Sequence, residues 1–165
     1  MVNLPGKRYT IEGHADEPNA AIIDSQSVKT VFPGEERGYD AGKRVKGRKR
    51  FIAVDTLGLL LSVMVISAAR SESAGGVELL DELERRFPKL RKVWADSGYS
   101  GELVEYAQHW CRFVLEIVKR SPEQKGFQVQ PKRWIVERTF GWINWWRRLS
   151  KDYEKTITSS KSMIK

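Results

Sequence analysis

The spacing of hydrophobic residues predicts a chain in which strands and helices alternate. Short apolar runs that are typical of buried strands cover 20–24, 51–55, 59–69, 90–96 and 111–118. Apolar residues three and four apart predict helices over 77–87 and 102–110, and Pro88 ends the first of them. Thr56-Leu57-Gly58 separates two of the runs and predicts a hairpin. The pattern therefore predicts an α/β fold, with one mixed sheet of about five strands flanked by helices.

The longest predicted helix covers residues 133–154, where Gly141 is the only Gly or Pro. At 100° per residue, Glu137 lies within about 40° of a polar and cationic strip formed by Arg133, Gly141, Asn144, Arg148 and Lys151. The opposite side is apolar and consists of Ile135, Trp142, Trp146 and Leu149. Two interpretations of Glu137 follow. It is either ion-paired and inert, as on most surface helices, or it holds a metal while the cations hold phosphate.

The remaining stretches predict loops and tails. Residues 1–19 are polar and predict an N-terminal tail, and 70–76 and 121–131 predict a loop and a short connector. Residues 155–165 are small, polar and basic, which predicts a frayed C-terminal tail. The folded domain is therefore expected to cover 20–154.

Charge and composition limit which partners and which metal ions the chain is expected to bind. The 165 residues include 29 Lys and Arg against 21 Asp and Glu, a net charge of +8 that attracts polyanions, nucleic acid first. Cys111 is the only cysteine, and the two histidines, His14 and His109, are far apart in the sequence. This composition argues against a disulfide, a thiolate zinc cluster and a histidine cage. Any metal would be held by oxygen, which favours Mg²⁺ or Mn²⁺.

The sequence shows no signal-peptide pattern and no apolar run long enough to span a bilayer, so we expect a reducing, cytoplasmic setting without a membrane partner. Cys111 is expected to be an inert core residue.

Acidic residues end two of the predicted strands. Asp24 ends the first and Asp96 the fourth, and the two side chains would meet if these strands were neighbours. A helix across that edge would add Glu137. Three convergent carboxylates repel one another unless a cation lies among them. Two divalent ions bridged by carboxylates support in-line phosphoryl transfer. The simpler alternative makes Asp24 an exposed strand cap. Asp55 lies at the hairpin turn and is expected to cap it.

A run of cations precedes the hairpin and consists of Lys43, Arg44, Lys46, Arg48, Lys49 and Arg50. Such a run is either a solvated loop or the charged start of a strand, or it contacts DNA phosphates, which the net charge favours. Trp145 lies about 80° from Glu137 on the helix, where it either packs in the protein or stacks on a displaced base.

Five motifs resemble the catalytic part of the DDE transposases of bacterial insertion sequences. They are IDSQSVKT, GYDAGKRVKGRKRF, AVDTLGLLLSVMV, VWADSGYSG and RWIVERTFGWINWWRRLSKDYE. The resemblance runs from Ile23 to Glu154 and implies an RNase H-like fold with Asp24, Asp96 and Glu137 as a catalytic triad that binds two Mg²⁺ or Mn²⁺ ions. It also implies cleavage of DNA at transposon ends and strand transfer of the 3′-OH into target DNA, within a homo-oligomeric complex.

Departures from the family pattern qualify this expectation. Many relatives carry a tyrosine, an arginine, the glutamate and a lysine in fixed order on the last helix. Arg133 and Glu137 match, but Gln130 and Asn144 replace the tyrosine and the lysine, and Arg148 is a candidate substitute cation. Only 23 residues precede Asp24, whereas complete relatives carry an N-terminal region for end recognition. We therefore expect a second reading frame, whose upstream product supplies that region, or a decayed fragment.

Two alternatives to transposition stay open on this evidence. One is a related metal-dependent nuclease or resolvase on the same fold. The other is an inactive remnant that binds only DNA or an intact transposase.

Overall fold

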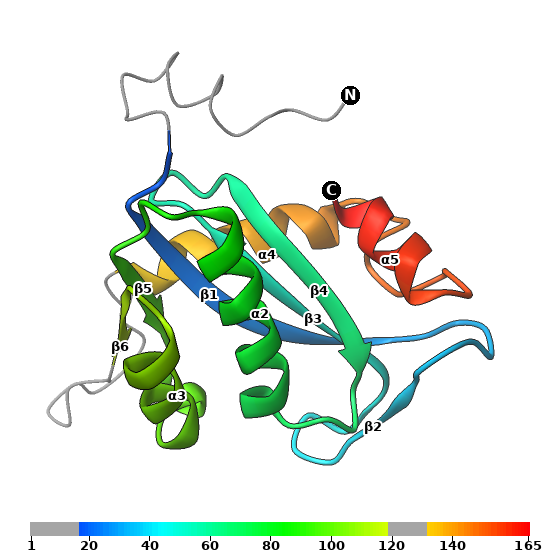
Figure 1. The fold of residues 1–165 in the computed structure, drawn as a ribbon. Coiled ribbons are helices and arrows are strands. Elements are labelled where there is room, and N and C mark those ends of the chain that lie inside the picture. Colours follow the sequence, from blue (N-terminus) through cyan, green and yellow to red (C-terminus); the bar gives the residue numbers. More distant parts are fainter. Residues whose placement is uncertain (1–16, 119–131) are drawn as a thin grey trace, which may run out of the picture.

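A computed structural model describes residues 17–118 and 132–165 (Figure 1). Their elements are β1 (Ala20–Lys29), β2 (Gly38–Asp40), β3 (Val45–Val54), β4 (Leu60–Ser67), α2 (Glu72–Arg86), β5 (Lys92–Ala95), the 3₁₀ turn η1 (Ser97–Tyr99), α3 (Glu102–Trp110), β6 (Val114–Ile117), α4 (Arg133–Trp145) and α5 (Ile157–Ile164). The predicted connector and most of the predicted N-terminal tail lie outside the described residues.

The six strands form one mixed sheet. Its order is β2-β3-β1-β5-β6, and β4 also pairs with β3. The pairs that involve β3 are antiparallel, whereas β1–β5 and β5–β6 are parallel. This mixed sheet with flanking helices confirms the predicted fold class. The hairpin between β3 and β4 is also confirmed, and Asp55 caps its turn by accepting the backbone N–H groups of Leu57 and Leu59, both at 2.8 Å.

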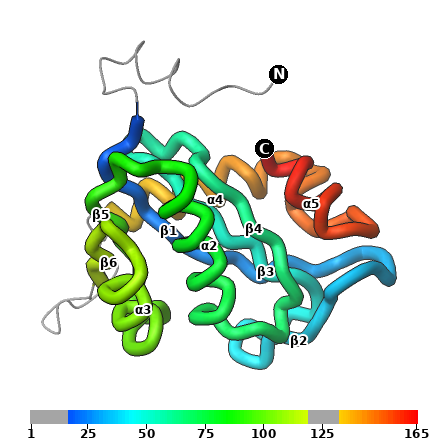
Figure 2. Tube along the Cα trace, viewed as in Figure 1, coloured from blue at the N-terminus to red at the C-terminus, as the bar shows by residue number. Residues whose placement is uncertain are grey.

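Helices cover both faces of the sheet (Figures 1 and 2). Alternate residues of a strand point to opposite faces, so β1 contributes Ala21 and Ile23 to the core under α2 and α3. Ile22 points the other way, into the core under α4 and α5. The molecule is therefore a three-layer α/β/α sandwich. No helix among the described residues is long and apolar enough to cross a membrane.

Helix α2 begins at Glu72, five residues before its predicted start. Ser71 caps it, because the side chain of Ser71 accepts the backbone N–H of Ala74. Gly75 and Gly76 lie where a side chain would overlap the Phe51 ring or the Leu103 methyl groups. The predicted loop over 70–76 was wrong because these glycines are needed for close packing of the helix on the sheet.

Helix α4 ends at Trp145, so the predicted helix over 133–154 was wrong in its second half. The backbone beyond it is held by contacts that are distant in sequence. Arg50 donates to the carbonyl oxygens of Leu149 at 2.6 Å and Lys151 at 3.2 Å, and the N–H of Asp152 donates to the carbonyl of Lys29 at 2.8 Å. These partners hold the segment along the end of β1 instead of in a helix.

The predicted C-terminal tail also forms structure. Residues Ile157–Ile164 form helix α5, and the side chain of Thr156 caps it by accepting the N–H of Ser159. α5 packs on β4, and Ile164 is buried in the core that α4 covers. The end of the chain is therefore part of the sandwich.

Candidate active site

The two aspartates lie on neighbouring strands. β1 and β5 run parallel, with Ile22 paired to Trp94, so Asp24 and Asp96 both lie two residues beyond this pair. Ile22 and Trp94 pack in the core under α4, so Asp24 and Asp96 point to that same face. The predicted adjacency of these strands is confirmed. Asp24 lies within β1 and not near its end, because β1 continues in antiparallel pairing with β3 to Lys29.

Helix α4 adds Glu137 to this edge, and Arg133 lies among the three carboxylates. Its Nη2 atom lies 4.0 Å from Oδ2 of Asp24, 3.5 Å from Oδ2 of Asp96 and 3.2 Å from Oε1 of Glu137. No two of these oxygens are therefore more than about 7.5 Å apart, the sum of the two longest distances, 4.0 and 3.5 Å. Three acids that are remote in sequence thus converge on one cation.

Backbone N–H groups fix one oxygen of each aspartate. Ser25 donates its N–H to Oδ1 of Asp24 at 2.7 Å, and Gly98 donates its N–H to Oδ1 of Asp96 at 2.9 Å. The second oxygen of each aspartate, Oδ2, is the one nearest Arg133. This arrangement holds both carboxylates with their free oxygens directed toward the same point.

The pKa of Asp24 is raised from its ordinary value. Burial raises its pKa, the N–H of Ser25 lowers it, nearby Asp96 raises it again, and the net result is a pKa of about 6. Its negative charge is therefore costly in the metal-free protein. A second cation near Oδ1 and Oδ2 would relieve that cost.

The donor set fits an oxygen-binding divalent metal. Three carboxylates of this kind suit Mg²⁺ or Mn²⁺, and the raised pKa of Asp24, which follows first from burial and then from nearby Asp96, shows that its negative charge is only partly offset by Arg133 and Lys43. Within 17–118 and 132–165, however, no three His, Cys, Asp or Glu side chains are grouped tightly enough to hold an ion as they stand. Arg133 instead lies between the carboxylates, and its guanidinium supplies the positive charge there.

Comparison with known proteins identifies the family. Residues 16–164 match the family model described as "Transposase DDE domain". The chain belongs to this family. A curated relative from Burkholderia cepacia, the putative transposase for insertion sequence element IS402, is 28% identical over 126 residues. This alignment covers 72% of the chain but only 59% of the relative, so the chain spans little more than half of the relative's length.

A solved structure supports the fold. It is the simian T-cell lymphotropic virus intasome in complex with a PP2A regulatory subunit, B56 gamma, determined by electron cryomicroscopy. Its matching chain superposes with a TM-score of 0.53 at 15% identity, over 90% of this chain and 47% of that one. At this identity the likeness bears on the fold alone, and it agrees with the RNase H-like sheet.

The basic run before the hairpin divides into an exposed and a buried half. Lys43, Arg44 and Lys46 are exposed, and Lys43 lies near Asp24. Arg48, Lys49 and Arg50 lie on β3 and are 0%, 5% and 1% exposed.

The predicted DNA contact is therefore corrected for these three residues, because their charges are satisfied inside the protein. Arg48 pairs with Asp152 at 3.4 Å, Lys49 donates to the carbonyl of Arg70 at 3.0 Å, and Arg50 donates to two carbonyls after α4.

The other predicted DNA contacts lie in and after α4. Arg133 lies in the carboxylate cluster, and Asn144 is half-buried. Trp145 is 83% exposed, and Lys151 is also exposed. Arg148 is exposed too and pairs with Glu154 at 2.8 Å. Because α4 ends at Trp145, Arg148 and Lys151 do not continue the helical strip that carries Glu137.

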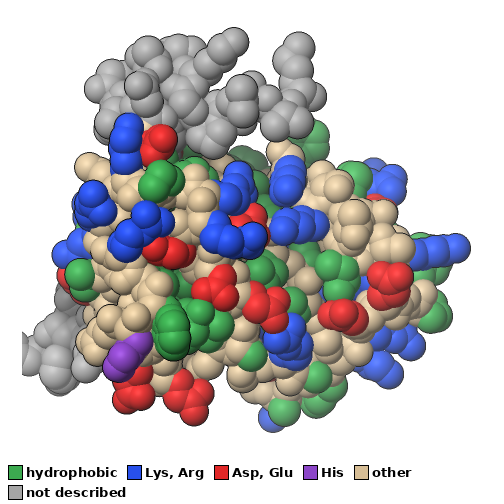
Figure 3. All heavy atoms as spheres, in the orientation of Figure 1, with side chains coloured by type: hydrophobic (Ala, Val, Ile, Leu, Met, Phe, Trp, Pro, Cys, Tyr) green, Lys and Arg blue, Asp and Glu red, His purple; other side chains and the backbone are tan. Residues whose placement is uncertain are grey.

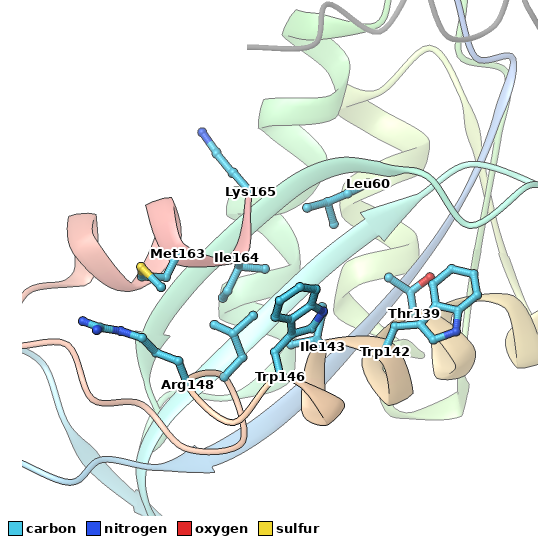
Figure 4. Close-up of a pocket in the computed structure, with 10 residues that line it drawn as sticks. Leu60, Thr139, Trp142, Ile143, Trp146, Arg148, Met163, Ile164 and Lys165 are labelled. Carbon is cyan, nitrogen blue, oxygen red and sulfur yellow. The ribbon is translucent and has the colours of Figure 1, made fainter. Parts of the chain in front are cut away.

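The predicted apolar side of α4 is only partly buried. Trp142 and Trp146 are 46% and 71% exposed and line a groove of about 470 Å³ between α4, β4 and α5 (Figure 4). Val136 and Phe140 instead face the sheet, with Ile135 and Ile143. The groove is lined by none of the three carboxylates, so it is separate from the candidate active site.

The face formed by α2 and α3 carries mixed charges (Figure 3). Its acidic and basic side chains are interspersed, and several form pairs, such as Arg70 with Glu78, Arg86 with Glu82, and Arg112 with Glu84. This face is not a continuous cationic surface, whereas Asp24 and Asp96 point to the opposite, α4 face.

One residue at this site was missed by the sequence analysis. Glu72, the first residue of α2, accepts hydrogen bonds from Ser25 and Lys43. It lies in the stretch 70–76, which was predicted to be a loop. Ser71 followed by an acid is a helix-start signal that would have indicated its position.

Proposed function

We propose that the chain is the catalytic domain of an insertion-sequence transposase, which cleaves DNA at transposon ends and joins the 3′-OH to target DNA. In this proposal Asp24, Asp96 and Glu137 hold two Mg²⁺ or Mn²⁺ ions. The observation that carries it is the convergence of these carboxylates on Nη2 of Arg133 within 4.0 Å. Family membership supports the same assignment.

The residues of the site have distinct roles in this proposal. Bound divalent ions would supply activation of the attacking oxygen and stabilisation of the leaving oxygen. The N–H groups of Ser25 and Gly98 keep Asp24 and Asp96 oriented before any ion arrives. Arg133 offsets part of the negative charge of the carboxylates without metal, and its guanidinium would turn to a DNA phosphate when metal replaces it.

DNA is the proposed partner, and its backbone would lie along the exposed cations. The contacting set is Lys43, Arg44, Lys46, Arg133, Asn144, Trp145, Arg148 and Lys151. In this proposal the exposed ring of Trp145 stacks on an unpaired base, a contact that contributes about 1–3 kcal/mol where it forms. A second copy of the chain and an upstream-frame product are further proposed partners in the transposition complex.

The test is a cleavage and joining assay with Mg²⁺ and DNA that carries the ends of the parent element. Asp24→Ala, Asp96→Ala and Glu137→Gln should each reduce cleavage by more than about a thousandfold, because each removes a ligand that no neighbour replaces. Binding to the same DNA should persist in all three. Glu102→Gln, at an exposed glutamate on α3, is the matched control and should cleave normally.

The pattern of products separates the alternatives. Full activity in any of the three variants would remove that residue from the triad. Hydrolysis without joining would indicate a nuclease, and salt-sensitive DNA binding without any Mg²⁺-dependent product would indicate an inactive remnant.

A further inference from the structure

Glu72 lies against the candidate active site from the other face of the sheet. Ser25 follows Asp24 on β1 and therefore points to the α2 face, where its hydroxyl donates to Oε1 of Glu72 at 3.0 Å. The Nζ of Lys43 donates to the same oxygen at 2.9 Å. The Glu72 side chain is 27% exposed, so this ion pair is partly shielded from water.

The second oxygen of Glu72 lies against the loop that carries Asp96. A Cβ atom on Gly98 would lie 2.6 Å from Oε2 of Glu72 and 3.1 Å from Oδ1 of Asp96. The loop and the carboxylate therefore approach so closely that a larger residue at position 98 would have to displace one of them. Glu72 is thus hydrogen-bonded to the segment that follows Asp24 and leaves no room for a side chain on the segment that follows Asp96.

These two segments also supply the N–H groups that orient the aspartates. Ser25 donates its N–H to Asp24 at 2.7 Å, and Gly98 donates its N–H to Asp96 at 2.9 Å. One carboxylate is therefore hydrogen-bonded to the residue that orients Asp24 and packs closely beside the residue that orients Asp96, although it belongs to neither strand. Its position is fixed by the Ser71 cap and by the close packing of Gly75 against Phe51.

The charge of Glu72 is stabilised where it lies. Burial raises its pKa, but the hydrogen bond and charge of Lys43, together with the Ser25 hydroxyl, outweigh burial and leave the pKa below its ordinary value. Glu72 is therefore ionised at neutral pH and can accept both hydrogen bonds. Lys43, which is 43% exposed, is thereby held beside the carboxylates with part of its surface open to a phosphate.

We propose that Glu72 is a positioning residue, which holds Ser25 and the Gly98 loop so that Asp24 and Asp96 are prearranged for metal, and which tethers Lys43 at the edge of the site. This inference rests on the proposed function, because it assigns Asp24 and Asp96 to metal binding. Groups that orient metal ligands in this way typically contribute about 10–100-fold in metal affinity.

The test measures Mn²⁺ binding by calorimetry on the full chain without DNA, together with Mg²⁺-dependent cleavage. Glu72→Ala should weaken Mn²⁺ binding by about 10–100-fold, and Glu72→Gln should weaken it less because an acceptor oxygen remains. Ser25→Ala removes no charge, so a loss of several-fold in this variant reports orientation. Glu78→Gln, at another ion-paired glutamate of α2, is the matched control and should bind like the wild type.

The Lys43→Met variant separates tethering from orientation. It removes a positive charge beside the carboxylates, so Mn²⁺ binding should not weaken, whereas DNA binding should become weaker and less dependent on salt. A variant at Glu72 that shows only this DNA phenotype, with normal Mn²⁺ affinity, would contradict the positioning role.

The outcomes distinguish the two proposals. If wild-type protein binds Mn²⁺ but Glu72→Gln and Ser25→Ala bind it equally well, the positioning role is overturned and the proposed function stands. If Glu72→Ala binds weakly and Ser25→Ala binds normally, Glu72 acts through its charge alone, which also overturns positioning. If the wild type neither binds Mn²⁺ nor cleaves DNA, the proposed function fails and the positioning role with it.

Discussion

Two arginine-centred clusters in this domain have opposite charge balances. At the candidate active site, Arg133 lies among three carboxylates, and the side chains of Arg133 and Glu137 are 20% and 50% exposed. Beside α5, Arg48 and Arg50 share Asp152 as their nearby acid, and all three are at most 1% exposed. The first cluster has an excess of negative charge, and the second an excess of positive charge.

The partners of the second cluster explain why its excess charge is tolerated. Arg48 donates to the carbonyl oxygens of Glu35 at 2.7 Å and Lys155 at 2.9 Å, and Arg50 donates to that of Leu149 at 2.6 Å. Backbone carbonyls thus accept most of the hydrogen bonds that the two buried arginines can donate, although Nε of Arg50 has no partner among the described residues. At the candidate active site, one guanidinium faces three carboxylates. A buried cluster held by backbone carbonyls stabilises the fold, and an accessible cluster with unbalanced charge has capacity for a ligand.

The largest expected effect on stability comes from breaking the buried cluster. Arg48→Met should lower the free energy of unfolding by about 3–5 kcal/mol, because it removes the arginine that is ion-paired with buried Asp152 and leaves several buried carbonyls without a donor. Urea unfolding measures the loss. Arg44→Met, at an exposed cation of the same run, is the control, and a loss below about 1 kcal/mol for Arg48→Met would contradict the structural role.

Removing the charge of Asp24 is expected to have a smaller effect on stability, and of opposite sign. Its pKa is raised from 3.8 to about 6, so the fold favours the protonated form. The stabilisation from protonation is complete below pH 3.8 and lost as the pH rises through about 6. At 1.36 kcal/mol per pKa unit, ionisation leaves the metal-free protein up to about 3 kcal/mol less stable at pH 7.5.

Asp24→Asn should therefore stabilise the protein at pH 7.5 in EDTA and lose this advantage by about pH 4. Denaturant unfolding at pH 4, 6 and 7.5 measures the difference between variant and wild type. A variant that is less stable than the wild type at pH 7.5 would show that the carboxylate serves the fold and not a ligand.

Removing Arg133 should have a weaker effect that metal reverses. Arg133→Met leaves the three carboxylates without their shared cation, which in this partly exposed cluster should lower stability by about 1 kcal/mol without metal. Saturating Mg²⁺ should remove most of the deficit, since the ion supplies the missing charge. Mg²⁺ should not restore the stability that Arg48→Met loses. If Mg²⁺ restored the stability of both variants equally, the two clusters would not differ in metal binding.

The smallest effect on stability is expected from substitutions in the exposed half of the basic run, Lys43, Arg44 and Lys46. Lys46→Met should leave unfolding unchanged and should lower the slope of log affinity for DNA against log salt by about 1, because one phosphate contact is lost. Fluorescence anisotropy at several salt concentrations measures the slope. An unchanged slope would remove Lys46 from the proposed DNA surface.

The sequence predicted those elements whose signals are local. The hairpin at 56–58 and the helix at 102–110 follow from turn residues and apolar spacing, and both are present. The polar second half of β1 gave no such signal, because only its pairing with β3 keeps it extended. The end of α4 was equally hidden, since Arg48 and Arg50 hold the following segment through contacts about 100 residues apart in sequence.

In the candidate site, too, local sequence signals predicted some features, whereas contacts between distant residues could not be predicted. The motifs were enough to predict the three acids Asp24, Asp96 and Glu137 as site residues. The acids that follow apolar runs suggested that β1 and β5 could be neighbours. The position of Arg133 among the three carboxylates required coordinates, as did the burial of Arg48 and Arg50. Glu72 was missed because it lies in a stretch that was predicted to be a loop, and the packing of Gly75 and Gly76 that places this stretch in a helix required coordinates.

The most direct test of the central claim is anomalous diffraction from crystals of the protein soaked in Mn²⁺. The account predicts an anomalous peak between Asp24 and Asp96, with Arg133 turned away from them, and no such peak in Asp24→Asn crystals. Mn²⁺ bound only elsewhere, with Arg133 still against all three carboxylates, would contradict the claim that this cluster is a metal-binding active site.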